Sequence, residues 1–228
     1  VVSSAASDVY KRQLEILENG NIGLKNPFHP DNSPADLIKI IKSLNERGIS
    51  CPVLLRITDY LAFRIKQINN SFFKAIREIG YRGEYKGVFP VKVNQQAQVI
   101  DRIVEFGKEF DFGLEVGSKP ELLIALAHDL SANSTIICNG IKDREFIHLA
   151  ILSIKIGFKT ILVLESPREL DLIIKISKEL NVRPLLGIRV KLTNKVSGNW
   201  SQSSGDRSAF GLSVEQVMEV LNKLKICL

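Results

Sequence analysis

The chain has 228 residues, of which 45% are hydrophobic and 25% are charged, and its net charge is +6. This composition is typical of a soluble globular protein, and no apolar run reaches the roughly eighteen residues that would predict a transmembrane helix. Basic residues are scattered among acidic ones, which is typical of a solvated surface and not of a nucleic-acid-binding one. We therefore expect a cytoplasmic protein with no nucleic-acid and no membrane partner.

The N-terminal residues predict small elements. Residues 1–13 are small and polar, lack periodicity and do not begin with Met, so we expect a disordered or non-native leader. The Asn19-Gly20 pair that follows is typical of a hairpin turn. A small β element is therefore predicted over residues 14–34.

Two helices and a strand are predicted next. Ser33 and Pro34 suit the N-cap and the first position of a helix, and Gly48 is placed to end it. A short apolar run at residues 52–57 predicts a strand. Residues 59–79 repeat isoleucine and phenylalanine at helical spacing, which predicts the longest helix.

From residue 86 onward, strand patterns alternate with helix patterns, which indicates a parallel α/β architecture. The five predicted strands are 86–93, 111–116, 134–138, 159–164 and 184–192. The five predicted helices are 95–107, 118–128, 142–156, 167–180 and about 213–225. A TIM barrel needs eight such units. A doubly wound sheet needs fewer, but no Gly-x-Gly-x-x-Gly turn follows any strand to support its dinucleotide-binding version.

The cysteines and histidines form no recognisable metal-binding or disulfide pattern. Cys51, Cys138 and Cys227 are widely separated in the sequence, which suits a reducing compartment. The three histidines also lie outside any metal-binding motif; they are His29, His128 and His148. The residues themselves therefore indicate no metal site.

The stretch KGVFPVKVNQQ, residues 86–96, places a lysine inside an apolar strand-like run. Lys92 has two interpretations. Its amine reaches water while the stem packs on apolar neighbours, or it is desolvated with a lowered pKa and acts as a nucleophile toward a carbonyl. Spacing alone does not decide between them.

Polar residues recur where the predicted strands end. Because catalytic groups of parallel barrels cluster at the carboxyl ends of the strands, these residues are candidates for one shared site. Strand ends are also polar simply because they meet loops, and for Asn139 and Glu165 both interpretations stay open. The full set is Lys92, Asn94, Glu115, Asn139, Glu165 and Arg189.

Four blocks of sequence, in order, resemble the biosynthetic arginine decarboxylases, which are fold-type III, alanine-racemase-like pyridoxal-phosphate enzymes. The similarity runs from about residue 50 to the end. The blocks are VFPVKVNQQ at 88–96, GLEVGSKPELLIALA at 113–127, CNGIKDREFI at 138–147, and SGNW at 197–200 with SSGDRSAFGL at 203–212.

The resemblance implies an N-terminal fragment of such an enzyme. Residues 14–58 would contribute to the family's β domain, and residues 59–228 would form the first part of its pyridoxal-phosphate-binding TIM barrel, with about five βα units. The family's later histidine strand, glycine-rich phosphate loop, pyridine-binding glutamate and catalytic cysteine would lie beyond Leu228. We therefore expect this chain to be inactive alone.

The resemblance also implies roles for four residues. Lys92 would form a Schiff base with pyridoxal 5′-phosphate and act in catalysis. Asn94, Glu115 and Arg189 would help to bind the cofactor, Glu115 near Lys92 and Arg189 near the ring. Glu121 also matches a family acid, but its place in the first turn of a helix explains it equally well.

The reaction implied is decarboxylation of L-arginine to agmatine and carbon dioxide, a step of polyamine and spermidine biosynthesis and of arginine catabolism. The alternatives are a diaminopimelate or ornithine decarboxylase of the same fold type, or a non-catalytic homologue that binds the cofactor. The family further implies a homodimer or higher homo-oligomer and a magnesium dependence. One departure from its pattern is Ala209, where the family usually has lysine before Phe-Gly-Leu, and the loop 197–206 is expected to pack at the dimer or over the site.

Overall fold

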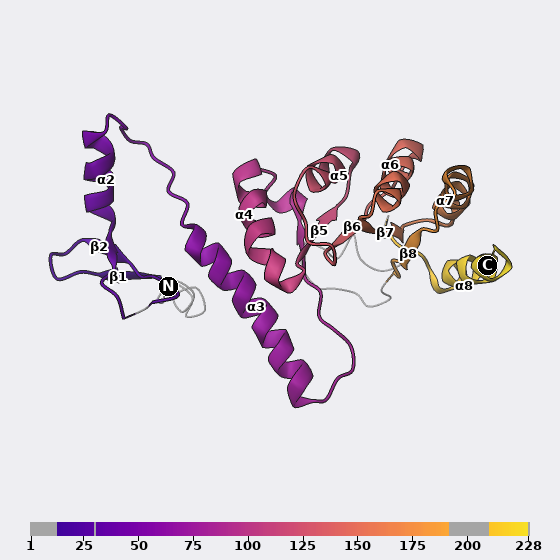
Figure 1. The fold of residues 1–228 in the computed structure, drawn as a ribbon, viewed down its shortest axis with the longest axis horizontal. Helices are drawn as coiled ribbons and strands as arrows, with labels where there is room; N and C mark the ends of the chain where they lie inside the picture. The colour runs from indigo at the N-terminus through magenta and orange to yellow at the C-terminus, as the bar shows by residue number, and fades with distance from the viewer. Residues whose placement is uncertain (1–12, 30, 192–209, 228) are drawn as a thin grey trace. The chain divides into compact units, whose positions relative to one another are not determined.

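The computed structural model describes residues 13–29, 31–191 and 210–227, and it divides the chain into two compact units. The first unit is Val1–Ser71 and the second is Phe72–Leu228, so the division falls within helix α3 (Thr58–Glu78). Figure 1 shows the elements of both units. Within the described residues, no helix is long and apolar enough to cross a membrane.

The first unit contains a small antiparallel sheet followed by one helix. Strands β1 (Leu14–Ile16), β2 (Ile22–Leu24) and β3 (Ala35–Asp36) pair in that order, and α2 spans Leu37–Glu46. Gly20 has a φ of +81°, as the tight turn between β1 and β2 requires. The hairpin prediction is thus confirmed.

Two predictions in this unit are wrong. Helix α2 does not begin at Ser33-Pro34, because Ala35 and Asp36 pair with β2; Asp36 is the N-cap and accepts hydrogen bonds from the amides of Ile38 and Lys39. Residues 52–57 form no strand. An apolar run becomes a strand only beside a pairing partner, and this run pairs with no segment that the structure describes.

The second unit is a five-stranded parallel sheet in the order β4-β5-β6-β7-β8, which confirms the predicted βα alternation. Its strands are β4 (Val88–Pro90), β5 (Gly113–Val116), β6 (Thr135–Cys138), β7 (Lys159–Leu164) and β8 (Leu185–Ile188). Its helices are α4 (Ala97–Gly107), α5 (Lys119–Leu126), α6 (Arg144–Lys155), α7 (Pro167–Leu180) and α8 (Val214–Cys227), with short 3-10 turns η1 (Val91–Val93) and η2 (Lys108–Phe110).

Helices cover one face of this sheet (Figure 1). Alternate strand residues that point to the helices are completely buried, for example Leu114, Leu162 and Leu164. Their neighbours Ile161 and Val163 point the other way and are partly exposed. This alternation is the period of two of a β-strand. The side chains that do not face the helices, such as Ile161 and Val163, therefore lie on the other face of the sheet.

Two of the predicted strands are shorter than expected at the carboxyl edge. The first was predicted over residues 86–93, but β4 ends at Pro90 and the chain tightens into η1. The fifth was predicted over residues 184–192, but β8 ends at Ile188. After β8, Val190 makes a parallel bridge to Leu212, so the chain returns to the same edge of the sheet.

Candidate functional site

The carboxyl ends of the five strands meet at one edge of the second unit, because every neighbouring pair is parallel and in register. Val116 lies opposite Cys138, and Leu164 lies opposite Ile188. The polar residues that follow these strands are therefore brought to one edge, as predicted. They form two clusters, a Glu115 pair beside η1 and a larger Glu165 cluster beside β8.

Lys92 lies in η1 and its side chain is exposed. The predicted strand of residues 86–93 does not reach Lys92, because the backbone leaves β4 at Pro90. Of the two interpretations of this lysine, the structure agrees with the one in which the amine reaches water. Within the part of the chain that the structure describes, the Lys92 amine has no hydrogen bond or ion pair. Pro90 lies opposite Glu115, so this free amine emerges at the end of the neighbouring strand.

Asn94 follows η1 and joins it to α4. Its backbone amide donates to the Val91 carbonyl at 3.2 Å, and its side-chain Oδ1 accepts from the Gln96 amide at 3.2 Å. Both bonds shape the turn that leads from Lys92 into the helix. The structure thus gives Asn94 a local structural contact next to Lys92.

Glu115 and Asn139 form the first cluster. Glu115 is 7% exposed, and its Oε1 accepts a hydrogen bond of 3.0 Å from Asn139 Nδ2. Asn139 is itself fixed by its backbone amide, which donates to the Val116 carbonyl at 2.8 Å. A buried carboxylate needs such donors. Asn139, which follows β6, therefore orients the Glu115 side chain of the neighbouring strand β5.

Glu165 is the centre of the second cluster, and its side chain is 1% exposed. Oε1 accepts from the Gly140 amide at 2.9 Å and from Arg189 Nη1 at 3.0 Å. Oε2 accepts from the Gly211 amide at 3.1 Å. One carboxylate therefore ties together the loop after β6, the end of β8 and the segment that returns before α8.

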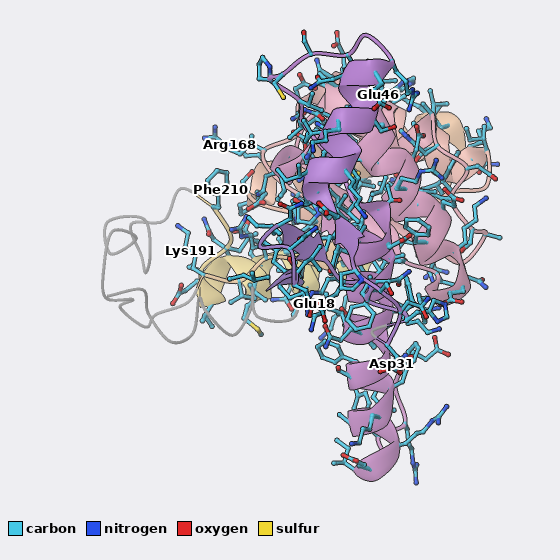
Figure 2. The ribbon with its side chains drawn as sticks, turned by 90° about the vertical axis from the view of Figure 1, so that its left-hand side faces the viewer. Glu18, Asp31, Glu46, Arg168, Lys191 and Phe210 are labelled. Atoms are coloured by element: carbon cyan, nitrogen blue, oxygen red, sulfur yellow. The ribbon has the colours of Figure 1, made fainter. Side chains whose placement is uncertain are left out.

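Arg189 completes this cluster. Its side chain is about half exposed, at 48%, and its guanidinium carbon lies 5.2 Å from the centre of the Phe210 ring. Figure 2 shows Phe210 on the same side of the ribbon as Lys191. The guanidinium is thus held by a carboxylate and an aromatic ring, although about half of the side chain is exposed.

A buried lysine and a second carboxylate lie beneath Glu165, and sequence reasoning missed both. Lys142 donates from Nζ to the Gly140 and Val163 carbonyls at 2.6 and 2.5 Å, and it lies 3.3 Å from Glu169 Oε2. Glu169 also accepts from the amides of Lys142 and Glu165, both at 2.8 Å. Burial lowers the pKa of the Lys142 amine, and the Glu169 carboxylate opposes that shift.

The signal for Glu169 was present in the sequence. The pattern Ser-x-x-Glu, typical of a capping box, occurs at Ser118–Glu121 and again at Ser166–Glu169. Glu121 lies in the first turn of α5 and accepts hydrogen bonds from the Gly117 amide and the Ser118 hydroxyl. Glu169 occupies the equivalent position in α7 and accepts a hydrogen bond from the Glu165 amide. It also pairs with Lys142, a contact that no local pattern predicts.

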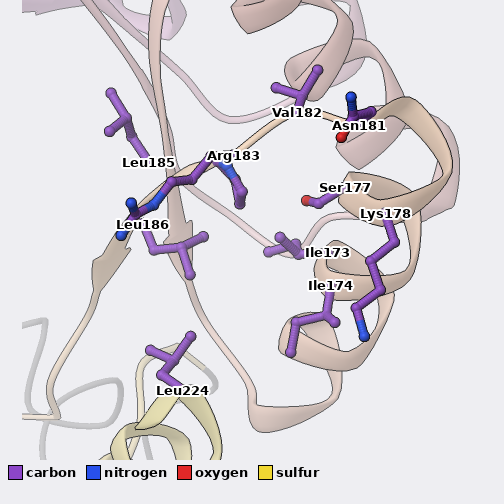
Figure 3. Close-up of a pocket in the computed structure, with 11 residues that line it drawn as sticks. Ile173, Ile174, Ser177, Lys178, Asn181, Val182, Arg183, Leu185, Leu186 and Leu224 are labelled. Atoms are coloured by element: carbon purple, nitrogen blue, oxygen red, sulfur yellow. The ribbon is translucent and has the colours of Figure 1, made fainter. Parts of the chain in front are cut away.

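A cavity of about 1030 Å³ lies at the opposite end of β8. Figure 3 shows Ile173 and Ser177 of α7 on one side, Leu185 and Leu186 of β8 on another, and Leu224 of α8 below. None of the polar residues of the carboxyl edge lines it. The cavity is therefore separate from the candidate site.

Some predicted features lie outside the described residues. These are the leader up to residue 12, the loop 197–206 and Ala209. Among the described residues, no three histidine, cysteine or acidic side chains are grouped so that they could hold a metal ion.

Comparison with known proteins identifies this arrangement. The fold is similar to the crystal structure of the biosynthetic arginine decarboxylase SpeA from Campylobacter jejuni, with a TM-score of 0.83 and 32% identity over 99% of this chain and 35% of that one. A diaminopimelate decarboxylase from M. jannaschii shares the fold at a TM-score of 0.68 and 19% identity, covering 94% of this chain and 45% of that one. The second unit is thus part of a (β/α) barrel of the fold-type III class.

A sequence model for the pyridoxal-binding domain of pyridoxal-dependent decarboxylases matches residues 65–226. The chain belongs to this family. It is 46% identical over 212 residues to the biosynthetic arginine decarboxylase of Gloeobacter violaceus, a match that covers 93% of this chain and 33% of that protein. The chain therefore spans about a third of the length of the curated relatives it matches.

The residues at the carboxyl edge fit a pyridoxal cofactor, which the family binds in this domain. An aldehyde needs a primary amine that is free of other partners, and Lys92 is exposed and unpaired among the described residues. The polar and anionic substituents of a pyridoxal ring need cationic and amide donors, and Arg189 and Asn139 lie at the same edge. The donor set therefore suits the group.

Proposed function

We propose that the protein to which this chain belongs decarboxylates L-arginine to agmatine and carbon dioxide, as a step of polyamine biosynthesis. The observation that carries the proposal is the 46% identity to a biosynthetic arginine decarboxylase over 93% of this chain. The exposed Lys92 at the strand edge supports it. The diaminopimelate decarboxylase neighbour, at 19% identity, supports the fold alone.

In this proposal Lys92 carries pyridoxal 5′-phosphate, and Asn94, Glu115 and Arg189 support the cofactor. When bound, the cofactor supplies an electron sink for the electron pair left when the carboxylate departs. The Lys92 amine must be uncharged to attack an aldehyde, and we assign Glu115, at the end of the neighbouring strand, a supporting role beside it. Asn139 keeps that carboxylate in one orientation through the 3.0 Å hydrogen bond.

The Arg189 guanidinium would bind and orient an anionic or polar part of the bound group. It carries five N–H donors in a planar fork, and Glu165 occupies one side of that fork through Nη1. In this proposal the remaining donors, on a side chain that is 48% exposed, contact the bound group. Orientation of this kind is the main contribution that a protein makes to cofactor chemistry.

Cofactor attachment is testable on this chain. We would incubate it with pyridoxal 5′-phosphate, reduce the imine with borohydride, and locate the reduced group by peptide mass spectrometry. Lys92 should be the principal labelled residue, and Lys92→Arg should abolish that label. Lys119→Arg, at another lysine of the same unit, is the matched control. Labelling spread evenly over the exposed lysines would contradict the proposal.

The reaction itself is testable on the full-length protein encoded by the gene. Release of labelled carbon dioxide should be much faster from L-arginine than from L-ornithine or diaminopimelate. A preference for either of the other two substrates would replace the proposed reaction with theirs. A protein that binds the cofactor but decarboxylates none of the three would be a non-catalytic homologue.

We also infer a cytoplasmic homodimer or larger homo-oligomer for the full-length protein, with magnesium as a further requirement. These inferences rest on the resemblance to the family. Light scattering would give the oligomeric state, and activity before and after treatment with a chelator would test the metal requirement. A monomer with full activity in the presence of chelator would contradict both.

A further inference from the structure

We propose that Glu165 is a positioning residue: its buried carboxylate fixes the Arg189 guanidinium and the Phe210–Leu212 segment at the edge of the cofactor site. Lys142 and Glu169 hold that carboxylate in place from below. The expected consequence, tighter cofactor binding, rests on the proposed function. The positioning itself rests only on the contacts of Glu165.

The Glu165 carboxylate accepts hydrogen bonds from three separate parts of the chain. Gly140 lies after β6, Arg189 lies after β8, and Gly211 lies just before α8, yet all three donate to one carboxylate within 3.1 Å. A carboxylate buried to this degree is unfavourable unless it is paired and hydrogen-bonded. The three donors therefore depend on Glu165, and Glu165 depends on them.

The segment Phe210–Leu212 packs closely against the residues that follow β8. The Leu212 amide donates to the Arg189 carbonyl at 2.8 Å, the Lys191 amide donates to the Leu212 carbonyl at 2.9 Å, and Leu212 is fully buried. Gly211 has a φ of +86°, and a Cβ there would lie 3.1 Å from the Arg189 carbonyl oxygen. Only glycine fits without a shift, so the position of this segment is narrowly defined.

The position of Glu165 also depends on Lys142 and Glu169, which are bonded to the backbone around it. Glu169 accepts from the Glu165 backbone amide, and Lys142 reaches both Glu169 and the carbonyl of Gly140. Gly140 in turn donates to Glu165. Lys142, Glu169 and Glu165 thus close a ring of contacts around the loop after β6, and this ring fixes the carboxylate that holds Arg189.

The decisive variant is Glu165→Gln, compared with Glu145→Gln as the matched control. Glu145 is an exposed acid of the same unit, 80% exposed in its ion pair with Lys119. The amide of Glu165→Gln has one acceptor oxygen where the carboxylate has two, so it cannot serve Gly211 and the Gly140–Arg189 pair together. Hydrogen exchange of the Gly211 amide should become at least about tenfold faster in Glu165→Gln and stay unchanged in Glu145→Gln.

A second variant separates positioning from simple loss of folding. Gly211→Ala should speed the hydrogen exchange of the Phe210–Leu212 amides, because its Cβ would crowd the Arg189 carbonyl oxygen. Exchange of the Gly140 amide should stay slow, because Glu165 is intact. If Glu165→Gln fails to fold, this variant and Arg189→Met, at a half-exposed side chain, still test the contacts. Unchanged exchange of the Leu212 amide in Gly211→Ala would overturn the proposed fit of the segment.

A double-mutant cycle tests the consequence for the cofactor. The quantity compared is the dissociation constant of pyridoxal 5′-phosphate, measured from the yield of borohydride-trapped label at Lys92. Glu165→Gln and Arg189→Met should each weaken binding about tenfold, and the double variant should be no weaker than either, because both act through one guanidinium. Additive losses, or equal binding in Glu165→Gln and Glu145→Gln, would overturn this role. If the wild-type chain shows no specific label at Lys92 but Glu165→Gln still releases Gly211, the proposed function fails and the positioning stands.

Discussion

Two lysines of the second unit lie at the carboxyl edge of the same sheet, and their surroundings are opposite. Lys92 follows β4, is exposed, and has no bonded partner among the described residues. Lys142 follows β6, has a completely buried side chain, and is bonded to two carbonyls and a carboxylate. The comparison separates a lysine that is available for chemistry from one that maintains the site.

The difference follows from the backbone around each lysine. At Lys92 the chain leaves the sheet as a single 3-10 turn, so the side chain meets solvent. At Lys142 the side chain is completely buried, and its amine bonds the Gly140 and Val163 carbonyls. A lysine in an apolar sequence is therefore not by itself evidence of a reactive amine, because its accessibility depends on the tertiary structure.

Removing the buried lysine should have the largest effect on stability. Lys142→Met leaves the Glu169 carboxylate buried beside two backbone amides and no cation, which should cost about 3–5 kcal/mol of unfolding free energy. Urea denaturation followed by circular dichroism measures the loss. Adding Glu169→Gln to Lys142→Met should recover part of it by removing the buried charge, and a double variant less stable than Lys142→Met would contradict this explanation.

Breaking the Glu115 pair should have a smaller effect. Asn139→Leu removes the donor to a carboxylate that is 7% exposed, and a buried acceptor left without its donor costs about 1–3 kcal/mol. Asn139→Asp, which places a second negative charge beside Glu115, should cost more than Asn139→Leu at neutral pH. The same urea titration tests both, and equal stability of the two variants would show that the charge of Glu115 is unimportant there.

The first unit should lose stability in acid through Asp36. Hydrogen bonds from Asn21, then Asn19 and the amides of Lys39 and Ile38, lower the pKa of Asp36 from 3.8 to about 2, although burial opposes them. A carboxyl whose pKa is lower in the folded chain binds fewer protons there than in the unfolded chain, so its stabilisation is complete above about pH 4 and is lost as the pH falls toward 2.

Carboxyl chemical shifts measured by NMR should therefore show Asp36 titrating well below the ordinary pKa of 3.8. Thermal melts of the wild type and Asp36→Asn should differ most near pH 5 and converge near pH 2. Curves separated by a constant amount at every pH would indicate that Asp36 contributes through its shape and not through its charge.

Changing the exposed lysine should have the smallest effect on stability. Lys92→Met removes no hydrogen bond or ion pair that the described residues make, so the free energy of unfolding should change by less than about 0.5 kcal/mol. The same variant should lose all specific cofactor labelling. A large loss of stability in Lys92→Met would remove the contrast between the two lysines.

Much of the fold could be predicted from local pattern. Helix α7 was predicted over its full length, 167–180. In the structure Pro167 begins it and Asn181, with a φ of +52°, ends it. The order of strands and helices follows from a period that changes repeatedly from two to 3.6. These features depend on neighbours a few residues apart, which the sequence displays directly.

The errors occurred where distant pairing decides the outcome. Ser33 and Pro34 are good residues to begin a helix, but pairing of Asp36 with β2 delays α2 until Leu37. Residues 52–57 have the composition of a strand, but they pair with no strand among the described residues. In both cases the competing term is hydrogen bonding to a segment that is remote in sequence.

The candidate site divides in the same way. The sequence by itself determined which strand ends carry polar residues, because each follows an apolar run, and its motifs single out Lys92. Only the tertiary structure decided that Glu165 bonds Arg189 and Gly211, which lie 24 and 46 residues further along the chain, and that Lys142 is buried beneath them. The physical reason is that burial and hydrogen-bond partners belong to the assembled edge of the sheet, where residues from several loops exclude water together.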